Sequence, residues 1–211
     1  MPNEQLKEDN IQKTLESGLK CFLMKGIEGT QLNDIVALSG ISRRSVLRYF
    51  NCKEKFVIAV LKFFGDYQYE YGCQLYYKNL KPHCSGLEAL KAYLNAVKTI
   101  FLENSDYFAL LAEGELYLGH SKCQTNSVIN NYVGNFTASS KALQDILEQG
   151  IKDGSIKHFT NFSPQESVVF CQSFFGMLIH LALSKGMGVY TLEDCMAIID
   201  KFLEMFFASI Q

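Results

Sequence analysis

Residues 26 to 54 contain two short helical patterns on either side of a single glycine, in the stretch GIEGTQLNDIVALSGISRRSVLRYFNCKE. Apolar side chains repeat at helical spacing in the first pattern, at Leu32, Ile35, Val36 and Leu38. Thr30 precedes this helix at a position suited to an N-cap, and Asp34 favours its positive end. Gly40 then supplies the positive φ that a sharp turn needs, and Ile41 fills the angle between the helices. The pattern predicts a helix-turn-helix unit.

The second helix of this unit carries a strongly basic surface. Ser42 is its expected N-cap, and the residues expected to face inward are Val46, Leu47 and Phe50. The residues left outside are Arg43, Arg44, Ser45, Arg48 and Tyr49. Three arginines and two lysines stand against one glutamate between residues 43 and 55, a local charge of +4 in a chain of net charge −2. Arginine suits guanine O6 and N7, so the pattern predicts a helix that enters the DNA major groove.

The segment from Ile11 to Leu61 resembles the N-terminal domain of the TetR (AcrR-like) family of bacterial transcription regulators. The residues that carry this resemblance are Ile11, Leu19, Phe22, Gly26, Thr30, Ile35, Gly40, Ile41, Ser42, Phe50, Lys53 and Glu54. The resemblance implies that Thr30 touches a phosphate, Asn33 lies near the groove, and Lys53 anchors the DNA backbone. It also implies that base edges are met by Arg43, Arg44 and Ser45.

Two residues depart from the pattern of that family. Arg44 stands where the family often has glycine or another small residue, and Leu47 stands where it usually has a tyrosine that leans on the DNA. We expect Arg48 and Tyr49 to take over part of the lost contact, and the DNA sequence that is read to differ from common family operators.

Composition agrees with a compact helical protein. The chain has 211 residues, of which 48% are hydrophobic and 20% charged, with three prolines. Its seven cysteines are scattered and odd in number, without a signal peptide, which favours reduced thiols in a cytoplasm. The strongly apolar stretch at residues 174–183 is too short to span a bilayer. We therefore expect a cytoplasmic protein, and the resemblance to the TetR family implies a bacterial one.

Helical periodicity continues to the end of the chain, so the fold class predicted is all-α with about nine helices. The expected helices are 4–25, 31–38, 42–49, 53–79, 85–103, 106–118, 122–152, 164–185 and 191–210. Residues 1–52 would form the three-helix DNA-binding domain and residues 53–211 a helical ligand-sensing and dimerisation domain. Residues 1–55 carry 9 basic and 7 acidic side chains, whereas the remainder carries 11 and 15, so the two parts have different partners.

The last two expected helices are apolar around most of their circumference and need neighbours on more than one side. Thr191 with Asp194 opens the final helix, and Gly176 would let another helix approach closely. In TetR-like proteins the corresponding helices pair with their copies in a four-helix interface, which implies a homodimer. The residues expected at this interface are Phe170, Phe175, Gly176, Phe202, Met205 and Phe206.

Aromatic residues gather in the middle of the chain. By the same resemblance, the helices between residues 53 and 185 enclose a pocket for a small apolar or aromatic effector. Its candidate walls are Phe64, Tyr67, Tyr71, Tyr107, Phe108, Glu115, Asn131, Tyr132, Phe136 and Phe174. Most aromatic residues fill ordinary cores, so these residues mark a region of the chain and not a defined site.

Other chemistries have little support in the sequence. His120 and Cys123 have a spacing compatible with metal ligation, but nothing brings four ligands together, so we expect no metal and no cofactor. No phosphate loop and no G-x-S-x-G motif occurs, so we expect no enzyme activity. The predicted function is a ligand-responsive transcriptional repressor that binds a pseudo-palindromic DNA operator as a dimer.

Two alternatives stay open. The same DNA-binding head could be controlled by a protein partner or by cysteine oxidation, for which Cys52 beside Lys53 is the most plausible thiol. In the other alternative, an all-helical enzyme or binding protein keeps the N-terminal fold and has lost its DNA function. Reductant-dependent DNA affinity would favour the first, and loss of salt-sensitive DNA binding the second.

Overall fold

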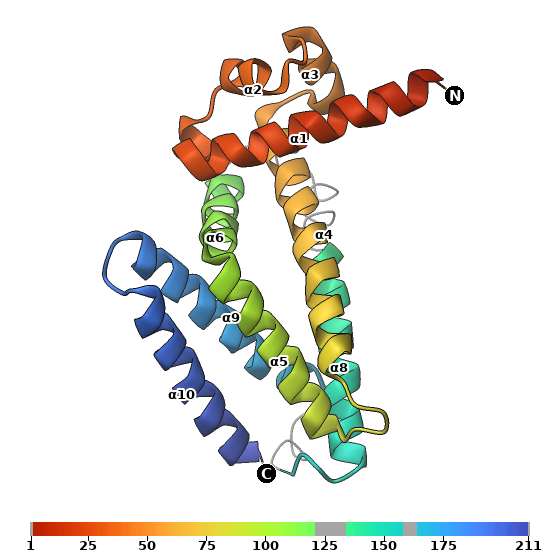
Figure 1. Ribbon diagram of the computed structural model, residues 1–211, viewed down its shortest axis with the longest axis vertical. Helices are drawn as coiled ribbons and strands as arrows, with labels where there is room; N and C mark the ends of the chain where they lie inside the picture. Colours follow the sequence, from red (N-terminus) through yellow and green to blue (C-terminus); the bar gives the residue numbers. More distant parts are fainter. Residues whose placement is uncertain (1, 121–133, 158–163, 211) are drawn as a thin grey trace. The chain divides into compact units, whose positions relative to one another are not determined.

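The computed structural model of the chain describes residues 2–120, 134–157 and 164–210. Within these ranges, the side chains of residues 2, 3, 134–140, 164–168 and 170–172 lie outside the description. The described residues form nine helices and no strand (Figure 1), which confirms the all-α prediction. The predicted residues Asn131 and Tyr132, and the first part of the expected helix 122–152, lie outside the described residues.

The helices follow the chain in the order expected. They are α1 (Pro2–Gly29), α2 (Leu32–Ser39), α3 (Arg43–Phe50), α4 (Lys53–Asn79), α5 (Gly86–Glu103), α6 (Ser105–His120), α8 (Gly134–Lys152), α9 (Pro164–Gly186) and α10 (Leu192–Ile210). They belong to two compact units, residues 1–67 with 110–135 and residues 68–109 with 136–211. The functional division after residue 52 stays a prediction.

The first unit has one hydrophobic core, to which α1, α2, α4 and α6 contribute side chains. Its core contains Phe22, Ile27, Ile35 and Phe56 together with Val57, Val60, Leu61 and Leu110. The helical path of α1 is interrupted at Gly26, whose φ of 73° and ψ of 168° are not helical. This break leaves the N–H of Ile27 without an intrahelical acceptor, and the Glu113 carboxylate of α6 accepts it at 2.5 Å. A side chain 86 positions away in the sequence thus completes the kink.

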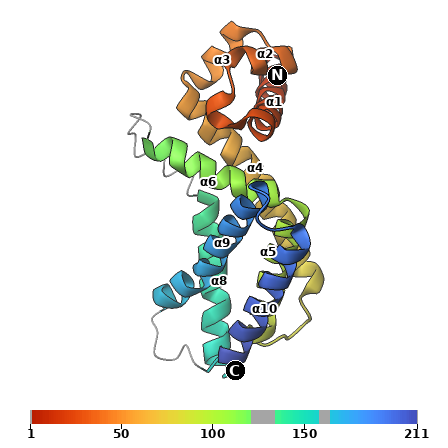
Figure 2. The same ribbon diagram turned by 90° about the vertical axis from the view of Figure 1, so that its left-hand side faces the viewer.

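The helices α2 and α3 lie side by side in this unit (Figures 1 and 2), joined by the turn at Gly40. Gly40 has a φ of 70°, and its N–H donates to the Val36 carbonyl at 3.0 Å, so the predicted left-handed turn is confirmed. Ser42 caps α3 as predicted, because its hydroxyl oxygen accepts the Ser45 N–H at 3.2 Å. The sequence therefore forms the predicted helix-turn-helix unit.

The prediction of Thr30 as the N-cap of α2 was wrong. The cap is Gln31, whose N–H donates to the Asp34 carboxylate at 2.8 Å. The Thr30 hydroxyl instead donates to the Gly26 carbonyl at 2.7 Å, and the side chain is buried. The kink at Gly26 explains the difference, since it leaves a carbonyl that Thr30 can satisfy.

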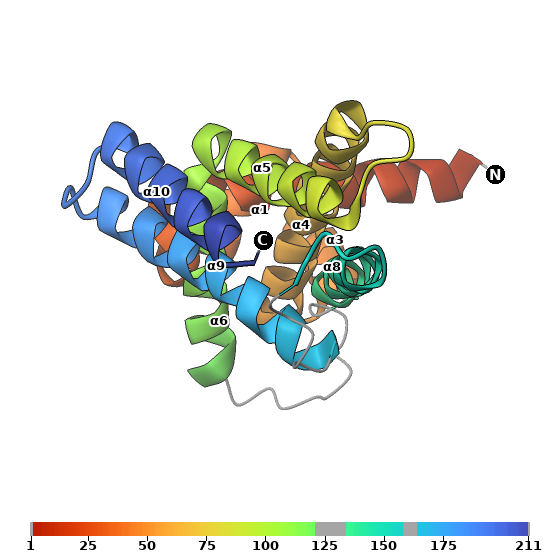
Figure 3. The ribbon, with the colours of Figure 1, turned by 90° about the horizontal axis from the view of Figure 1, so that it is seen from below.

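The second unit packs α5, α8, α9 and α10 around one core. Its fully buried side chains include Phe101, Leu143, Leu147, Ile156, Phe174, Leu178 and Ile199. The helices α9 and α10 are neighbours in sequence and lie side by side, as Figures 2 and 3 show from two directions. The predicted opening of α10 is confirmed, because Asp194 accepts from both the N–H and the hydroxyl of Thr191, at 2.8 and 2.7 Å.

None of the helices in the described ranges has the length and apolar character needed to cross a membrane. The thiols of Cys21, Cys73, Cys84 and Cys195 are not in disulfide bonds. Burial raises the pKa of the Cys195 thiol, and that of Cys21 is raised mainly by burial as well.

Candidate nucleic-acid interface

The outer face of α3 presents three arginine side chains to solvent. Arg43, Arg44 and Arg48 are exposed, whereas Ser45 and Tyr49 are half-buried. Val46 is 2% exposed and faces the core, as predicted. Leu47, also predicted to face inward, does so only in part, because its side chain is 44% exposed. One helix thus separates a buried apolar side from a basic surface.

The three guanidinium groups have different surroundings. Arg43 donates to the Asn33 side-chain oxygen at 3.0 Å, which ties the start of α3 to α2. The Arg48 guanidinium lies 5.3 Å from the centre of the Tyr49 ring. Arg44 has no hydrogen bond or ion pair with any residue in the described ranges. Its guanidinium is therefore the one most available to a partner molecule.

Lys53 begins α4, but its side chain is directed within the unit. The Lys53 ammonium donates to the Glu28 carbonyl at 3.0 Å and lies 5.6 Å from the centre of the Tyr117 ring. Thr30, which the resemblance assigned to a phosphate, is 2% exposed with its hydroxyl engaged. A DNA contact by Thr30 or Lys53 would need these hydrogen bonds to be replaced or shared. Asn33 differs from both, because its side chain is exposed.

An ion pair fixes the N-terminal end of α2 beside this surface. The Lys25 ammonium lies 2.6 Å from the Asp34 carboxylate. The hydrogen bond from Lys25, followed by the one from the Gln31 N–H, holds the pKa of Asp34 below its ordinary value. Asp34 therefore stays charged and supports the helix end that carries Asn33.

The predicted effector-pocket residues are divided between the two units. Phe64 packs on the core of the first unit, while Tyr67 and Glu115 are exposed. In the second unit Phe108 and Phe174 are buried in the core, and Tyr71 and Tyr107 pack against it. The Tyr71 hydroxyl donates to Glu103 at 2.6 Å. The side chain of Phe136 lies outside the description, so the ten residues do not form one described cluster.

Gln68 of α4 is a polar residue that the sequence patterns missed. Its side chain is buried, at 2% exposure, and neither the nitrogen nor the oxygen of its amide has a hydrogen-bond partner among the described residues. A buried amide without partners costs about 1 to 3 kcal/mol. A bound group with one donor and one acceptor would remove this cost.

The residues predicted at the dimer interface differ in their exposure. Met205 is 63% exposed and Gly176 is also exposed, with no atom within 4 Å of the position that a Cβ would take. Phe175 and Phe202 are half-buried, whereas Phe206 is 6% exposed and belongs to the core of its own chain. The side chain of Phe170 lies outside the description. Other exposed apolar residues on or between α9 and α10 are Val169, Leu183, Met187, Val189, Leu192 and Met196.

Histidine, cysteine and carboxylate side chains do not gather into a possible metal site within the described ranges. His120 ends α6, where its Nδ1 lies 2.8 Å from the Leu116 carbonyl. Cys123 lies outside the described residues.

The arrangement of helices is found in other proteins. Residues 15–60 match the model for bacterial regulatory proteins of the tetR family. No curated protein matches the sequence significantly.

Among solved structures, the regulator FadR from Bacillus subtilis, in complex with stearoyl-CoA, has a TM-score of 0.68 at 17% identity over 95% of this chain and 99% of its own. A TetR-family regulator from Agrobacterium tumefaciens has a TM-score of 0.66 at 19% identity, over 94% and 98%. A putative TetR-family regulator from Rhodococcus sp. has a TM-score of 0.67 at 16% identity, over 94% of this chain and 98% of its own. These similarities extend over both compact units.

Proposed function

Since the chain belongs to the TetR family of bacterial transcriptional regulators, we propose that it is a dimeric, effector-responsive repressor that binds a pseudo-palindromic operator. The observation that carries this proposal is the exposed basic face of α3, which a serine cap and a glycine turn hold at the surface of the first unit. In a dimer, two such helices would enter successive major grooves roughly 34 to 36 Å apart. The protein would work in the bacterial cytoplasm.

The proposed DNA contacts follow from exposure and bonding. Arg44 reads a base edge, because its guanidinium is exposed and has no partner among the described residues. Arg43, held by Asn33, and Arg48, held against Tyr49, supply positioned positive charge. Ser45 lies in the first turn of α3 and supplies a hydroxyl group for contact with the DNA. Lys53 and Thr30 support the shape of the head through their bonds to Glu28 and Gly26.

The effector is a mainly apolar molecule with one polar group. Aromatic side chains lie in the core of the second unit and pack against it. The amide of Gln68 lacks both a donor and an acceptor partner among the described residues. FadR from Bacillus subtilis, crystallised with stearoyl-CoA, shows that a protein of this fold takes a molecule of mixed polarity. An effector that offers Gln68 an acceptor and a donor would gain affinity from that pairing.

A hydrogen bond connects α6 with the DNA-reading region, and it could transmit the effect of a bound effector to the DNA-binding helices. The Glu113 carboxylate of α6 holds the Ile27 N–H at the kink in α1, two helices before the arginine face. Movement of α6, or of α4 that begins at Lys53, would therefore shift the support of α2 and α3. The effect of the effector on DNA affinity is limited by its differential affinity for the two arrangements.

The direct test is to select binding sequences from a random duplex pool with the purified full-length protein. We expect enrichment of two half-sites related by a dyad, with an affinity that falls steeply as salt rises. Fluorescence anisotropy on the selected duplex and on a random duplex then measures the specificity ratio. Failure to enrich any sequence, with weak binding to both duplexes, would contradict the proposal.

A further inference from the structure

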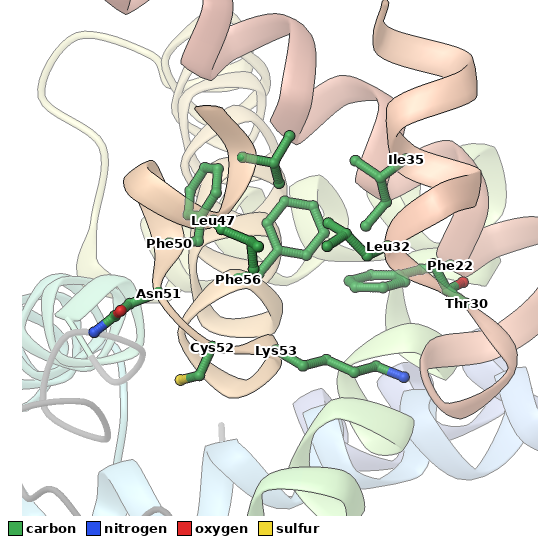
Figure 4. Close-up of a pocket in the computed structure, with 11 residues that line it drawn as sticks. Phe22, Thr30, Leu32, Ile35, Leu47, Phe50, Asn51, Cys52, Lys53 and Phe56 are labelled. Atoms are coloured by element: carbon green, nitrogen blue, oxygen red, sulfur yellow. The ribbon is translucent and has the colours of Figure 1, made fainter. Parts of the chain in front are cut away.

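A cavity of about 160 Å³ lies inside the DNA-reading head, which we define as α1, α2, α3 and the first turn of α4. Figure 4 shows apolar side chains around it, with Cys52 and Lys53 along one edge. We propose that this cavity is a binding site for a small neutral molecule with one aromatic ring, and that its occupant stabilises the reading head. The site belongs to the first unit and is separate from the proposed effector region around Gln68.

The deep walls of the cavity are apolar and almost fully buried. Phe22, Ile35, Val46 and Phe56 each have an exposure of 4% or less. Burial of an apolar guest against such walls is favourable at roughly 25 cal/mol per Å² of surface removed from water. Leu47, 44% exposed, contributes to the same lining and reaches from the surface of α3 to the cavity.

Two of the polar groups that line the cavity already have partners. The Thr30 hydroxyl donates to the Gly26 carbonyl, and the Lys53 ammonium donates to the Glu28 carbonyl. Neither donor is therefore available to a charged guest, whose desolvation would go uncompensated. These bonds select for an uncharged, apolar occupant.

The aromatic walls favour a ring over an aliphatic chain. The ring centres of Phe22 and Phe56 are 5.9 Å apart at an interplanar angle of 67°, and those of Phe50 and Phe56 are 4.9 Å apart at 70°. Edge-to-face contacts of this kind add stabilisation beyond the burial of area. A planar guest would extend the same arrangement.

The volume limits the size of the guest. An engineered apolar cavity of about 150 Å³ in another protein stays dry and binds benzene. The cavity of 160 Å³ is of that size, so it suits a single ring with at most one or two small substituents.

An occupant would contact every element of the reading head at once. The lining residues come from α1 (Phe22), α2 (Ile35), α3 (Val46) and α4 (Phe56), with Asn51 in the turn between α3 and α4. A guest therefore strengthens the contacts that fix the orientation of α3. Ligand that binds only the folded state raises the melting temperature of that state.

Benzene is the probe, titrated into the full-length protein. With a Kd on the order of 1 mM, a few millimolar benzene should raise the melting temperature by about 3 °C. Intermolecular nuclear Overhauser effects from benzene to the methyl groups of Ile35 and Val46 should locate it. No shift in the wild-type protein, or contacts to other methyl groups only, would overturn the proposal.

Leu47→Phe fills the cavity from its exposed side and should abolish the benzene shift. Leu38→Phe is the matched control, since Leu38 is 51% exposed on the neighbouring helix and is not part of the lining. This variant should keep the full shift. Equal benzene-induced shifts of the melting temperature in both variants would mean that benzene binds elsewhere. If Leu47→Phe does not fold, the Overhauser contacts in the wild-type protein show whether benzene occupies the cavity. No DNA is used, so failure here leaves the proposed repressor function untouched.

Discussion

Arg44 differs from the other two arginines of α3 in the availability of its guanidinium group. Arg43 and Arg48 are held by Asn33 and Tyr49, whereas Arg44 has no partner among the described residues. Both nitrogens at the end of its fork can therefore pair with the O6 and N7 of one guanine. Lysine at this position would keep the charge but lose the two-point contact.

Arg44→Lys should weaken binding to the selected operator by about 1 to 3 kcal/mol with an unchanged salt slope. Arg44→Ala should weaken specific binding similarly and reduce the salt slope by about 1. Anisotropy titrations at several salt concentrations, on operator and random duplexes, measure both quantities. Lys20→Ala removes an exposed charge from α1 as a control. Equal losses on both duplexes for Arg44→Lys would contradict base reading.

Gln68 offers a test that needs no ligand. Methionine has a similar volume and no unmet polar atoms, so Gln68→Met should raise the free energy of unfolding by about 1 kcal/mol and the melting temperature by about 3 °C. Gln74→Met is the control, because Gln74 is exposed on the same helix and should change neither quantity. Thermal and urea unfolding give the comparison. Destabilisation by Gln68→Met would mean that the amide has a partner in solution.

At the level of single elements, α2 depends on a carboxylate at its first turn. The Lys25 ammonium and the Gln31 N–H lower the pKa of Asp34. A carboxyl group whose pKa is lower in the folded state stabilises the fold above its unfolded pKa, and this contribution disappears as the pH falls through the folded value. The loss of this stabilisation is therefore expected in the acid range, below about pH 4.

Asp34→Asn should lower the melting temperature at neutral pH, and its difference from the wild type should shrink between about pH 5 and pH 2. Circular dichroism melts across this range measure the difference. Asp66→Asn, at an exposed carboxylate of α4 paired with Lys62, controls for the loss of surface charge. If the difference in melting temperature grew toward low pH, the pKa of Asp34 would be raised by folding and not lowered.

The kink of α1 depends in a similar way on Glu113. Removal of this acceptor leaves the Ile27 N–H unpaired, so Glu113→Ala should destabilise the first unit by about 1 to 3 kcal/mol, whereas Glu113→Gln keeps an acceptor oxygen and should cost less. Hydrogen exchange of the Ile27 amide should accelerate in the alanine variant. Glu115→Ala, exposed on the same helix, is the control. Unchanged protection of Ile27 in Glu113→Ala would refute the contact.

Local signals explain which elements could be predicted from the sequence. The turn at Gly40, the cap at Ser42 and the opening of α10 at Thr191 depend on residues within four positions, and all three are confirmed. Thr30 was assigned wrongly because its partner is set by the kink at Gly26. Glu113 was missed because its partner is 86 positions away and is a backbone group.

The candidate site shows the same limit. The basic face of α3 could be predicted, because it depends on charge and helical spacing alone. The exposure of Leu47, the unmet amide of Gln68 and the cavity between Phe22 and Phe56 could not. They depend on how side chains from several helices share space, which no short window of sequence contains.

At the level of the whole molecule, the proposed dimer depends on the apolar surface of α9 and α10. Met205 on α10, and Met187 and Val189 in the connection between the two helices, are each more than 60% exposed in the single chain. Apolar side chains that gather on one exposed surface mark a protein interface. A two-fold axis through this surface would give the DNA-binding unit the symmetry of a palindromic operator.

Met205→Glu should convert the dimer to a monomer, because it would bury a charge without a partner at the interface. Analytical ultracentrifugation measures the mass, and operator binding should weaken with it. Met24→Glu is the matched control, since Met24 is 78% exposed on α1, outside this surface. A wild-type chain that sediments as a monomer at operator-binding concentrations would contradict the dimer.

The bond from Ile27 to Glu113 also has a consequence for how this protein can change in evolution. Its donor is a backbone N–H, so every amino acid except proline supplies it at position 27, while position 113 must keep an acceptor. Substitutions at the two positions therefore need not compensate each other. In a set of aligned relatives, pairwise covariation would not reveal this connection between α6 and the DNA-reading head, even where every member depends on it.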